Sequence, residues 1–268
     1  MFPLKTSIFP ATAADLGRHL NDSLRELFAL THDPVEVRDK SYPHLDSLTA
    51  CLDGAQLPER PPPMPSSTGE QRPALTIDSL ALNASPLVVG PAPVQFKLAA
   101  KDVELRRAND RDENILLLVH DASDGHIEIS LAISDLEALI AEVARTEAGK
   151  HGVNIEGVEL SLRSRSPRSL AADVRLRAKK MFFTASLGVT GQLDLDEQLN
   201  ARISGLDCTG EGAIASVACG VLKPHLQKLD GREFPLMSLP LGEVRLHDVR
   251  IALDDKLSVT AEFGSARE

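Results

Sequence analysis

The 268-residue sequence is poor in aromatic residues: it has no tryptophan, a single tyrosine (Tyr42) and an aromatic fraction of 3%. Proteins that bind single-stranded nucleic acid stack bases on aromatic rings, so this composition argues against that class. The formal net charge of -10 argues the same way, because nucleic-acid binders usually carry a positive surplus. No nucleic-acid partner is expected.

Cysteines are few as well. Cys51, Cys208 and Cys219 are odd in number and widely spaced, which fits neither a disulfide framework nor a zinc site. The sequence therefore predicts free thiols, with Cys219 as a small buried thiol on a helix, and a reducing compartment. No apolar run approaches the roughly 20 residues of a membrane-spanning helix, and no signal peptide is recognisable. We expect a soluble, cytoplasmic protein, and association with the periphery of the inner membrane stays open.

Catalytic motifs are also missing. The sequence lacks GxSxG, GxxxxGK and, after a strand, GxGxxG, and its eight histidines show no zinc-helix spacing. The nearest approach to a catalytic cluster is His120-Asp121 followed by Asp124-Gly125-His126, although hairpin turns commonly have such residues without chemistry. We therefore expect a protein that is not an enzyme, with no catalytic residue, metal site or cofactor. A hydrolase that depends on His120 or His126 is the least favoured alternative.

The sequence is rich in strand-like alternation. From about Ile155 to the end, apolar and polar residues follow the period of two that is typical of strands. In Val174-Arg175-Leu176-Arg177, the valine and the leucine lie on one face and both arginines on the other. The pattern predicts an α+β protein with a long antiparallel sheet that has one apolar face. That face has to be covered by helices, by a partner or by a bound apolar ligand.

Three segments show helical periodicity: 11–30, a segment that begins at Ser134, and about 211–229. Ser134 and Glu137 have the spacing of a capping box, which predicts that their side chains satisfy free backbone N–H groups at the start of the second helix. Pro224 predicts a bend or an early end of the third helix.

The remaining segments are predicted to be strands, turns and one loop. Residues 106–114 and the pair Asp124-Gly125 are expected to be turns, and 244–263 a closing hairpin. The proline-rich stretch at about 57–73 is expected to be an exposed loop, because prolines lack backbone donors and favour extended conformations. Residues 1–268 are expected to form one domain.

A basic segment stands out in this acidic chain. Its seven basic residues lie within eighteen positions and are opposed only by Asp173: Arg163, Arg165, Arg168, Arg175, Arg177, Lys179 and Lys180. Such a segment is compatible with a solvated strand face that resists aggregation, or with contact to anionic lipid headgroups. The candidate headgroup or membrane contacts are Arg175, Arg177, Lys179 and Lys180. Phe182 and Phe183 follow, with one ring expected on each face.

Two longer stretches, ISDLEALIAEV and PLMSLPLGEVRLHDVRIALDDKLSVTAEFG, resemble the LmeA-like bacterial members of the tubular lipid-binding (TULIP) superfamily. The matching residues are Ser134, Leu136, Leu139, Ile140, Leu239, Pro240, Leu241, Gly242, Val249, Leu257, Val259 and Ala261. The resemblance covers most of the chain. It implies a TULIP-like half-barrel, in which a long, highly curved antiparallel sheet wraps around amphipathic helices and leaves an apolar groove for lipid acyl chains.

We therefore expect non-enzymatic binding, and transfer, of a lipid or another hydrophobic ligand in that groove. The residues expected to line it are Leu136, Leu139, Ile140, Val143, Val174, Leu176, Phe183, Leu187, Ile214, Val217, Val221 and Leu222. A sixteen-carbon chain gains about 12 kcal/mol on leaving water but little on leaving a bilayer, which suits a carrier that must release its cargo. The expected partners are a phospholipid or other acyl-chain ligand and, transiently, an anionic membrane surface. The alternative is a scaffold that holds a protein partner and has a fully packed core.

Overall fold

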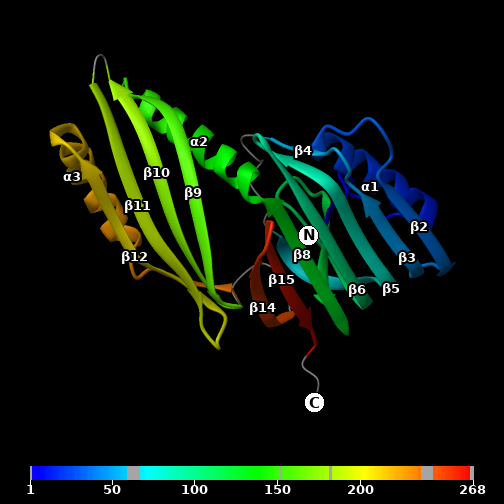
Figure 1. The fold of residues 1–268 in the computed structure, drawn as a ribbon. Coiled ribbons are helices and arrows are strands. Elements are labelled where there is room, and N and C mark those ends of the chain that lie inside the picture. Colours follow the sequence, from blue (N-terminus) through cyan, green and yellow to red (C-terminus); the bar gives the residue numbers. More distant parts are fainter. Residues whose placement is uncertain (1, 59–66, 151, 181–182, 237–243, 266–268) are drawn as a thin grey trace. The chain divides into compact units, whose positions relative to one another are not determined.

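A computed structural model describes residues 2–58, 67–150, 152–180, 183–236 and 244–265 (Figure 1). The chain divides into two compact units, Met1–Ile129 with Leu239–Asp248 and Thr260–Glu268, and Ser130–Ser238 with Val249–Val259. The expected α+β class is confirmed, with three helices and a majority of strands in the described ranges. The strands form two sheets, however, in place of the single long sheet expected, and no strongly curled sheet is found among the described residues.

The larger sheet has ten strands and is mixed, with the order β14-β15-β8-β6-β5-β3-β2 along its main path. Its strands are β1 (Phe2–Pro3), β2 (Val35–Ser41), β3 (His44–Cys51), β4 (Gln56–Leu57), β5 (Thr68–Val89), β6 (Ala92–Asn109), β7 (Ile115–Asp121), β8 (Asp124–Ala132), β14 (Arg245–Leu253) and β15 (Lys256–Gly264). Strands β3 and β4 both pair with β5 in the parallel sense. Parallel neighbours need a long return connection, and the proline-rich segment supplies it.

Part of that segment is strand. The expected loop covered about 57–73, whereas β5 already begins at Thr68 and includes Pro73. The register between β5 and β6 shifts on either side of this region, between Thr68 and Arg72 and again between Pro73 and Leu75. Proline is tolerated at such irregularities because a ladder hydrogen bond is already missing there. Residues 59–66 lie outside the described ranges.

Two expected turns in the first unit are wrong in detail. Arg106 to Asn109 are the last residues of β6, and the turn begins at Asp110, whose carboxylate accepts hydrogen bonds from the backbone of Asp112 and Asn114. Asp124-Gly125 opens β8 and makes no turn. Strands β7 and β8 do not pair with each other as a hairpin, because both of them pair with β6.

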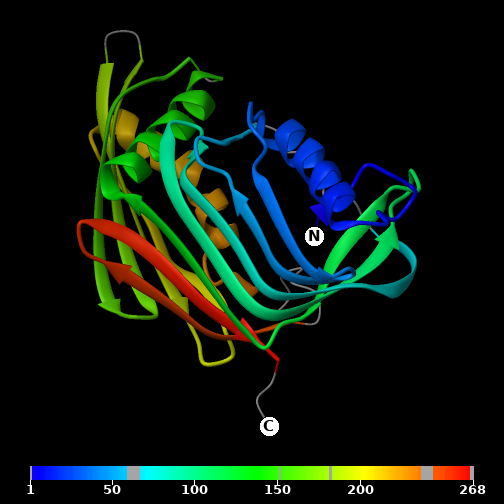
Figure 2. The same ribbon diagram turned by 90° about the vertical axis from the view of Figure 1, so that its right-hand side faces the viewer.

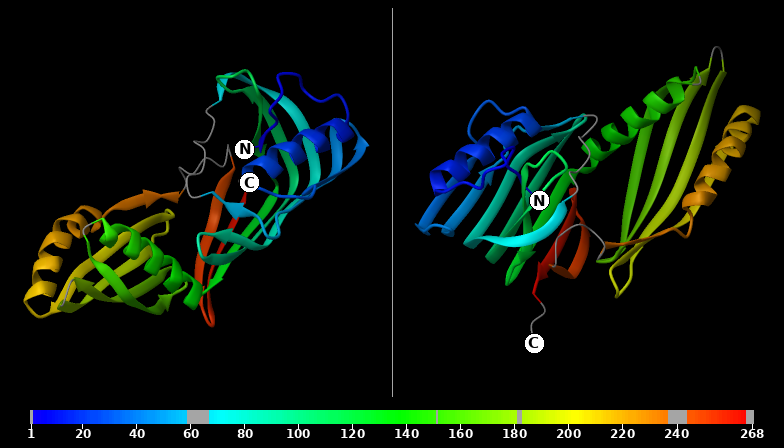
Figure 3. Two further views of the ribbon diagram at one scale, coloured as in Figure 1. Left: turned by 90° about the horizontal axis from the view of Figure 1, so that it is seen from above. Right: turned by 180° about the vertical axis from the view of Figure 1, so that it is seen from behind.

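Helix α1 (Ala13–Phe28) confirms the first predicted helix. The hydroxyl of Thr12 accepts the backbone N–H of Asp15 and thereby caps the start of the helix. Leu16, Leu20 and Leu24 form its buried stripe, and the helix lies along one face of the neighbouring strands, as the view from above in Figure 3 shows.

The smaller sheet has five antiparallel strands, as the alternation predicted, in the order β13-β12-β11-β10-β9. These strands are β9 (Asn154–Ser166), β10 (Ser169–Lys180), β11 (Phe183–Leu195), β12 (Asn200–Glu211) and β13 (Glu233–Pro235). Helix α2 (Ile133–Gly149) contacts β9, and helix α3 (Ala213–Leu229) contacts β12 and β11. No described helix combines the length and the apolar character that a membrane span requires.

The two helices differ from the sequence prediction at their ends. The N-cap of α2 is Ala132, and no side chain caps it. The capping box is therefore wrong: the Oε2 atom of Glu137 instead accepts the backbone N–H of Leu160, 2.8 Å away, and so ties the helix to β9. Helix α3 does not stop early, since it continues through Pro224 to Leu229.

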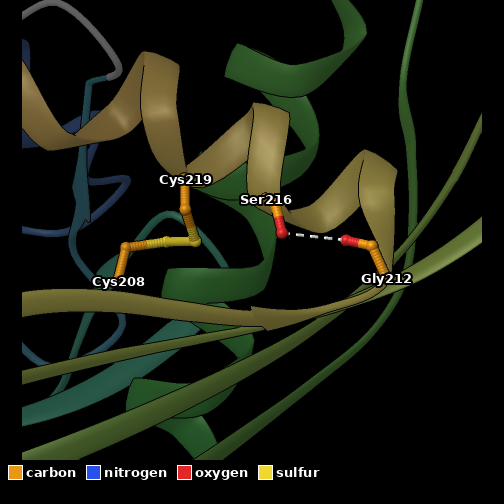
Figure 4. Close-up of a disulfide and its surroundings, with 4 residues drawn as sticks. All are labelled: Cys208, Gly212, Ser216 and Cys219. Atoms are coloured by element: carbon orange, nitrogen blue, oxygen red, sulfur yellow. Dashed lines mark hydrogen bonds between the residues drawn. A yellow bond between two sulfur atoms is a disulfide. The ribbon is translucent and has the colours of Figure 1, made fainter.

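The expectation of three free thiols is also wrong. Cys208 on β12 and Cys219 on α3 form a disulfide, while Cys51 is free and exposed (Figure 4). The turn from β12 into α3 brings the two Cα atoms to 5.4 Å, within the range that a disulfide bridges. In the same turn, the hydroxyl of Ser216 donates to the carbonyl oxygen of Gly212.

Candidate functional site

One face of the smaller sheet is apolar across its full width. The register places Val158, Leu176, Leu187 and Gly210 in a single row across β9, β10, β11 and β12. The next row is Leu160, Val174, Val189 and Cys208, and the one after it contains Leu162, Ala172 and Gly191. Since side chains alternate between faces along a strand, all of these residues lie on the same face.

Helices α2 and α3 both pack on this face, at its opposite edges (Figure 2). Under α2, a buried cluster consists of Ala141, Ile155, Val158 and Ala178. Under α3, a separate buried cluster consists of Ala185, Leu187 and Ala215. Leu176 packs against both clusters and stands between them in the row. The helices therefore leave a strip of sheet between them, which we call the floor.

The floor is apolar but incompletely covered. Its side chains are half-buried rather than buried: Leu160, Leu162, Ala172, Val174, Leu176, Val189, Leu193, Ile203 and Leu206. The row that contains Leu162, Ala172 and Gly191 has little side-chain bulk, because Ala172 pairs with Gly191 there. A side chain at Gly191 would collide with Leu206, whose Cδ2 atom lies 2.8 Å from the position of the added Cβ. The floor is thus a partly exposed apolar strip of sheet with one helix packed near each of its two edges.

Four of the residues predicted to line a groove lie on the apolar face of the smaller sheet or pack against it. Val174, Leu176 and Leu187 are on the apolar face, and Ile140 packs in the cluster under α2. Leu136, Leu139 and Leu222 are half-buried. The side chains of Phe183, Ile214, Val217 and Val221 lie outside the described part of the molecule.

Val143 is placed differently, since 58% of its surface is exposed. Helix α2 meets β9 mainly through small residues, Ala141, Ala144 and Ala148. The stripe that contains Leu136, Leu139 and Val143 therefore lies beside the contact with the sheet, about a third of a turn away. The sequence pattern identified an apolar helix but did not show that its alanines make the contact.

The candidate headgroup residues lie on the opposite face of the sheet. Arg175 and Arg177 alternate with Val174 and Leu176 along β10, and both are exposed, as is Lys179. The Nζ atom of Lys179 lies 3.8 Å from Oε1 of Glu156, and the side chain of Lys180 is outside the described residues. A molecule on the floor cannot reach these side chains, because the sheet lies between them. The two predicted sites are thus separate.

A carboxylate with a perturbed pKa also lies on this second face. The Ser169 hydroxyl donates to Oδ1 of Asp194 at 2.6 Å, and the Gln192 amide donates to both of its oxygens. These hydrogen bonds, first the one from Ser169 and then those from Gln192, hold the pKa of Asp194 below its usual range. The group joins β10 to β11 and is not part of the floor.

The two histidines singled out from the sequence, His120 and His126, lie on different strands. His120 on β7 and His126 on β8 are separated by the break between those strands, and no group of three metal-ligating side chains occurs among the described residues. The sequence analysis missed a different cluster, in which the Nδ1 atom of His44 lies 3.1 Å from Oγ1 of Thr76 and its Nε2 atom 2.7 Å from Oδ1 of Asp78. The side chains of His44 and Asp78 are partly exposed and Thr76 is exposed, while the Nε2 atom of His44 is itself buried; we assign these residues no catalytic role.

Comparisons with known proteins add no assignment. A scan of protein-family models, a search of curated proteins and a search of solved structures each gave no match. The function has to be inferred from the geometry of this chain.

Proposed function

We propose that the protein binds a lipid acyl chain, or a similarly elongated hydrophobic ligand, on the floor of the smaller sheet, and that it does so without catalysis. One observation carries the proposal. Two helices pack on the same apolar face at opposite edges, their clusters share only Leu176, and the floor between them stays half-exposed. A fully packed sheet and helix layer would bury these side chains.

The energetics suit a carrier. Each methylene that leaves water for an apolar surface gains roughly 0.8 kcal/mol, so the floor stabilises an otherwise exposed chain. The same methylene is already in hydrocarbon within a bilayer, and its transfer from there is nearly neutral. Uptake from a bilayer and release into it then both cost little free energy, and the fit to the floor decides which chain is preferred.

The proposal includes kinship with the tubular lipid-binding superfamily. It is supported by the two short motifs and by the order of helices and strands around the floor. The headgroup of a ligand bound there would lie on the helix side of the sheet, away from Arg175 and Arg177, and would need other polar partners.

The compartment follows from a different observation. The cytoplasmic location expected from the sequence depended on free thiols as well as on the lack of a recognisable signal peptide, whereas Cys208 and Cys219 are joined. Disulfides persist in oxidising compartments and are rare in the cytosol. The proposal therefore places the protein in an oxidising compartment, with transient contact to a membrane from which the ligand is taken.

Native mass spectrometry of the freshly purified full chain tests the proposal. The expected result is a lipid adduct that is displaced by added oleic acid, together with transfer of a fluorescent phospholipid between vesicles. Absence of any adduct and of any transfer would contradict it. A specific protein partner recovered with a ligand-free protein would favour the rival function, a scaffold with a packed core.

A further inference from the structure

The face of the smaller sheet opposite the floor has a hollow of its own, of about 670 Å³. It is centred on the row Val158, Leu176, Leu187 and Gly210, whose side chains point to the helices, so their backbone forms its base. Around that base stand Gly157, Glu159, Arg175, Arg177, Ser186, Gly188 and Thr209. No described residue of α2 or α3 lines it.

Glycines create the depth of this hollow. Gly157 pairs with Arg177, and Gly188 pairs with Arg175, so each arginine has a neighbour with no side chain. An added Cβ at Gly157 would meet nothing within 4 Å, and one at Gly188 would meet only Thr209, whose Oγ1 lies 3.0 Å away. Each arginine therefore has open space beside it on one neighbouring strand, and Glu159 or Ser186 beside it on the other.

The charges of the hollow favour an anion. Arg175 and Arg177 are two positions apart on β10, so their side chains leave the strand about 7 Å from each other. Arg177 makes no ion pair or hydrogen bond with another described residue. Arg175 has only a long contact, 3.7 Å from its Nε atom to Oδ1 of Asp173. Glu159, the register partner of Arg175, is the one acidic residue among the described residues of the lining.

Hydroxyl groups complete the set of donors. Ser186 pairs with Arg177 across β10 and β11, and Thr209 pairs with Gly188 across β11 and β12. Both side chains are exposed and lie on the arginine face. Two planar guanidinium forks on β10, with hydroxyls on the neighbouring strands, match the oxygens of a phosphate group, which arginine binds in bidentate fashion.

We propose that this hollow binds the phosphate ester of a ligand distinct from the one on the floor. Its volume lies in the range of small-molecule sites, and it exceeds what a bare phosphate ion fills, so a phosphate with an attached polar group fits best. A phospholipid headgroup at a membrane surface and a soluble phosphate ester both have this chemistry. The inference does not depend on the floor, because the two sites face opposite sides of the sheet.

Isothermal titration of the full-length protein with glycerol 3-phosphate and flotation with vesicles test the two sources. Vesicles of phosphatidylcholine with 30% phosphatidylglycerol are compared with pure phosphatidylcholine. Saturable binding of glycerol 3-phosphate identifies a soluble ester, and flotation with the anionic vesicles alone identifies a headgroup. Either result supports the proposal, and failure of both overturns it.

Four variants locate the site. R177Q is expected to weaken binding at least about tenfold, since it removes a charge-assisted contact, and Gly157→Leu to abolish it by filling the hollow while both arginines remain. Glu159→Gln is expected to strengthen binding. Arg163→Gln, on the same face of β9 but outside the hollow, is the matched control and should bind as the wild type does. Equal losses in R177Q and Arg163→Gln would show a general charge effect and contradict the site. An adduct of oleic acid in native mass spectrometry reports on the floor, because a fatty acid has no phosphate.

Discussion

Removal of the disulfide between Cys208 and Cys219 should loosen α3 selectively. The two cysteines are 11 residues apart, and closing a loop of that size restricts the opened chain by about 3 kcal/mol in the chain-entropy treatment. The described residues show few other restraints at the start of helix α3. Its N-cap is Gly212, which has no side chain to cap the helix, and its first turn has no acidic residue. Among its described side chains, Ala215 alone is fully buried.

Hydrogen exchange measured by mass spectrometry gives the local free energy of opening. In the double variant Cys208→Ser/Cys219→Ser, amides of α3 should exchange up to about 100-fold faster, because about 3 kcal/mol corresponds to roughly two powers of ten. Amides of α2, which is tied to β9 through Glu137, should be unchanged. The variant Cys51→Ser, at an exposed free thiol, is the control and should show wild-type exchange throughout.

The reasoning would be refuted by unchanged exchange in α3, which would mean that packing alone holds the helix. It would be refuted as well by an equal increase in α2 and α3. In that case the disulfide would stabilise the second unit as a whole, and α3 would not open independently of α2 at the edge of the floor.

Three further substitutions and one control test the fold. Gly125→Ala would place a Cβ 2.2 Å from the ring of Phe263, and it should cost about 1–3 kcal/mol in urea denaturation, whereas Gly157→Ala, with nothing within 4 Å, should change stability little. Leu16→Ala removes a fully buried side chain of α1 and should cost about 2–5 kcal/mol. The pKa of Asp194 is lowered in the folded protein, so its carboxylate stabilises the fold above the ordinary aspartate pKa, and this contribution disappears as the pH falls through the lower folded value. The stability difference between wild type and Asp194→Asn should therefore be present at pH 7 and vanish in acid, and a difference that persists at the lowest pH would contradict the hydrogen-bond account.

The faces of the strands could be predicted from the sequence, but the pairing of the strands could not. Alternation along β10 correctly separates Val174 and Leu176 from Arg175 and Arg177, because a period of two follows directly from strand geometry. The pattern contains no information on which strands are neighbours. The parallel pairing that brings His44 beside Thr76 and the division of the strands into two sheets both depend on contacts distant in sequence.

The candidate site shows the same limit. The sequence predicts apolar residues of α2 and of the strands as groove residues. It does not predict that α2 contacts the sheet through its alanines, because a helical pattern shows that a face is apolar but not which part of that face touches the sheet. The disulfide was missed for a related reason. Cys208 and Cys219 belong to a strand and a helix that fold back on each other, and spacing alone does not indicate such a turn.

Quenching of a single introduced tryptophan tests the floor most directly, because the natural sequence has none. Val189 lies on the floor and Thr190, the next residue, is exposed on the other face, so Val189→Trp and Thr190→Trp form a matched pair. Titration with a fatty acid brominated along its chain should quench the fluorescence of Val189→Trp saturably and leave that of Thr190→Trp unchanged. Equal quenching of both, or quenching of neither, would contradict binding of an acyl chain between α2 and α3.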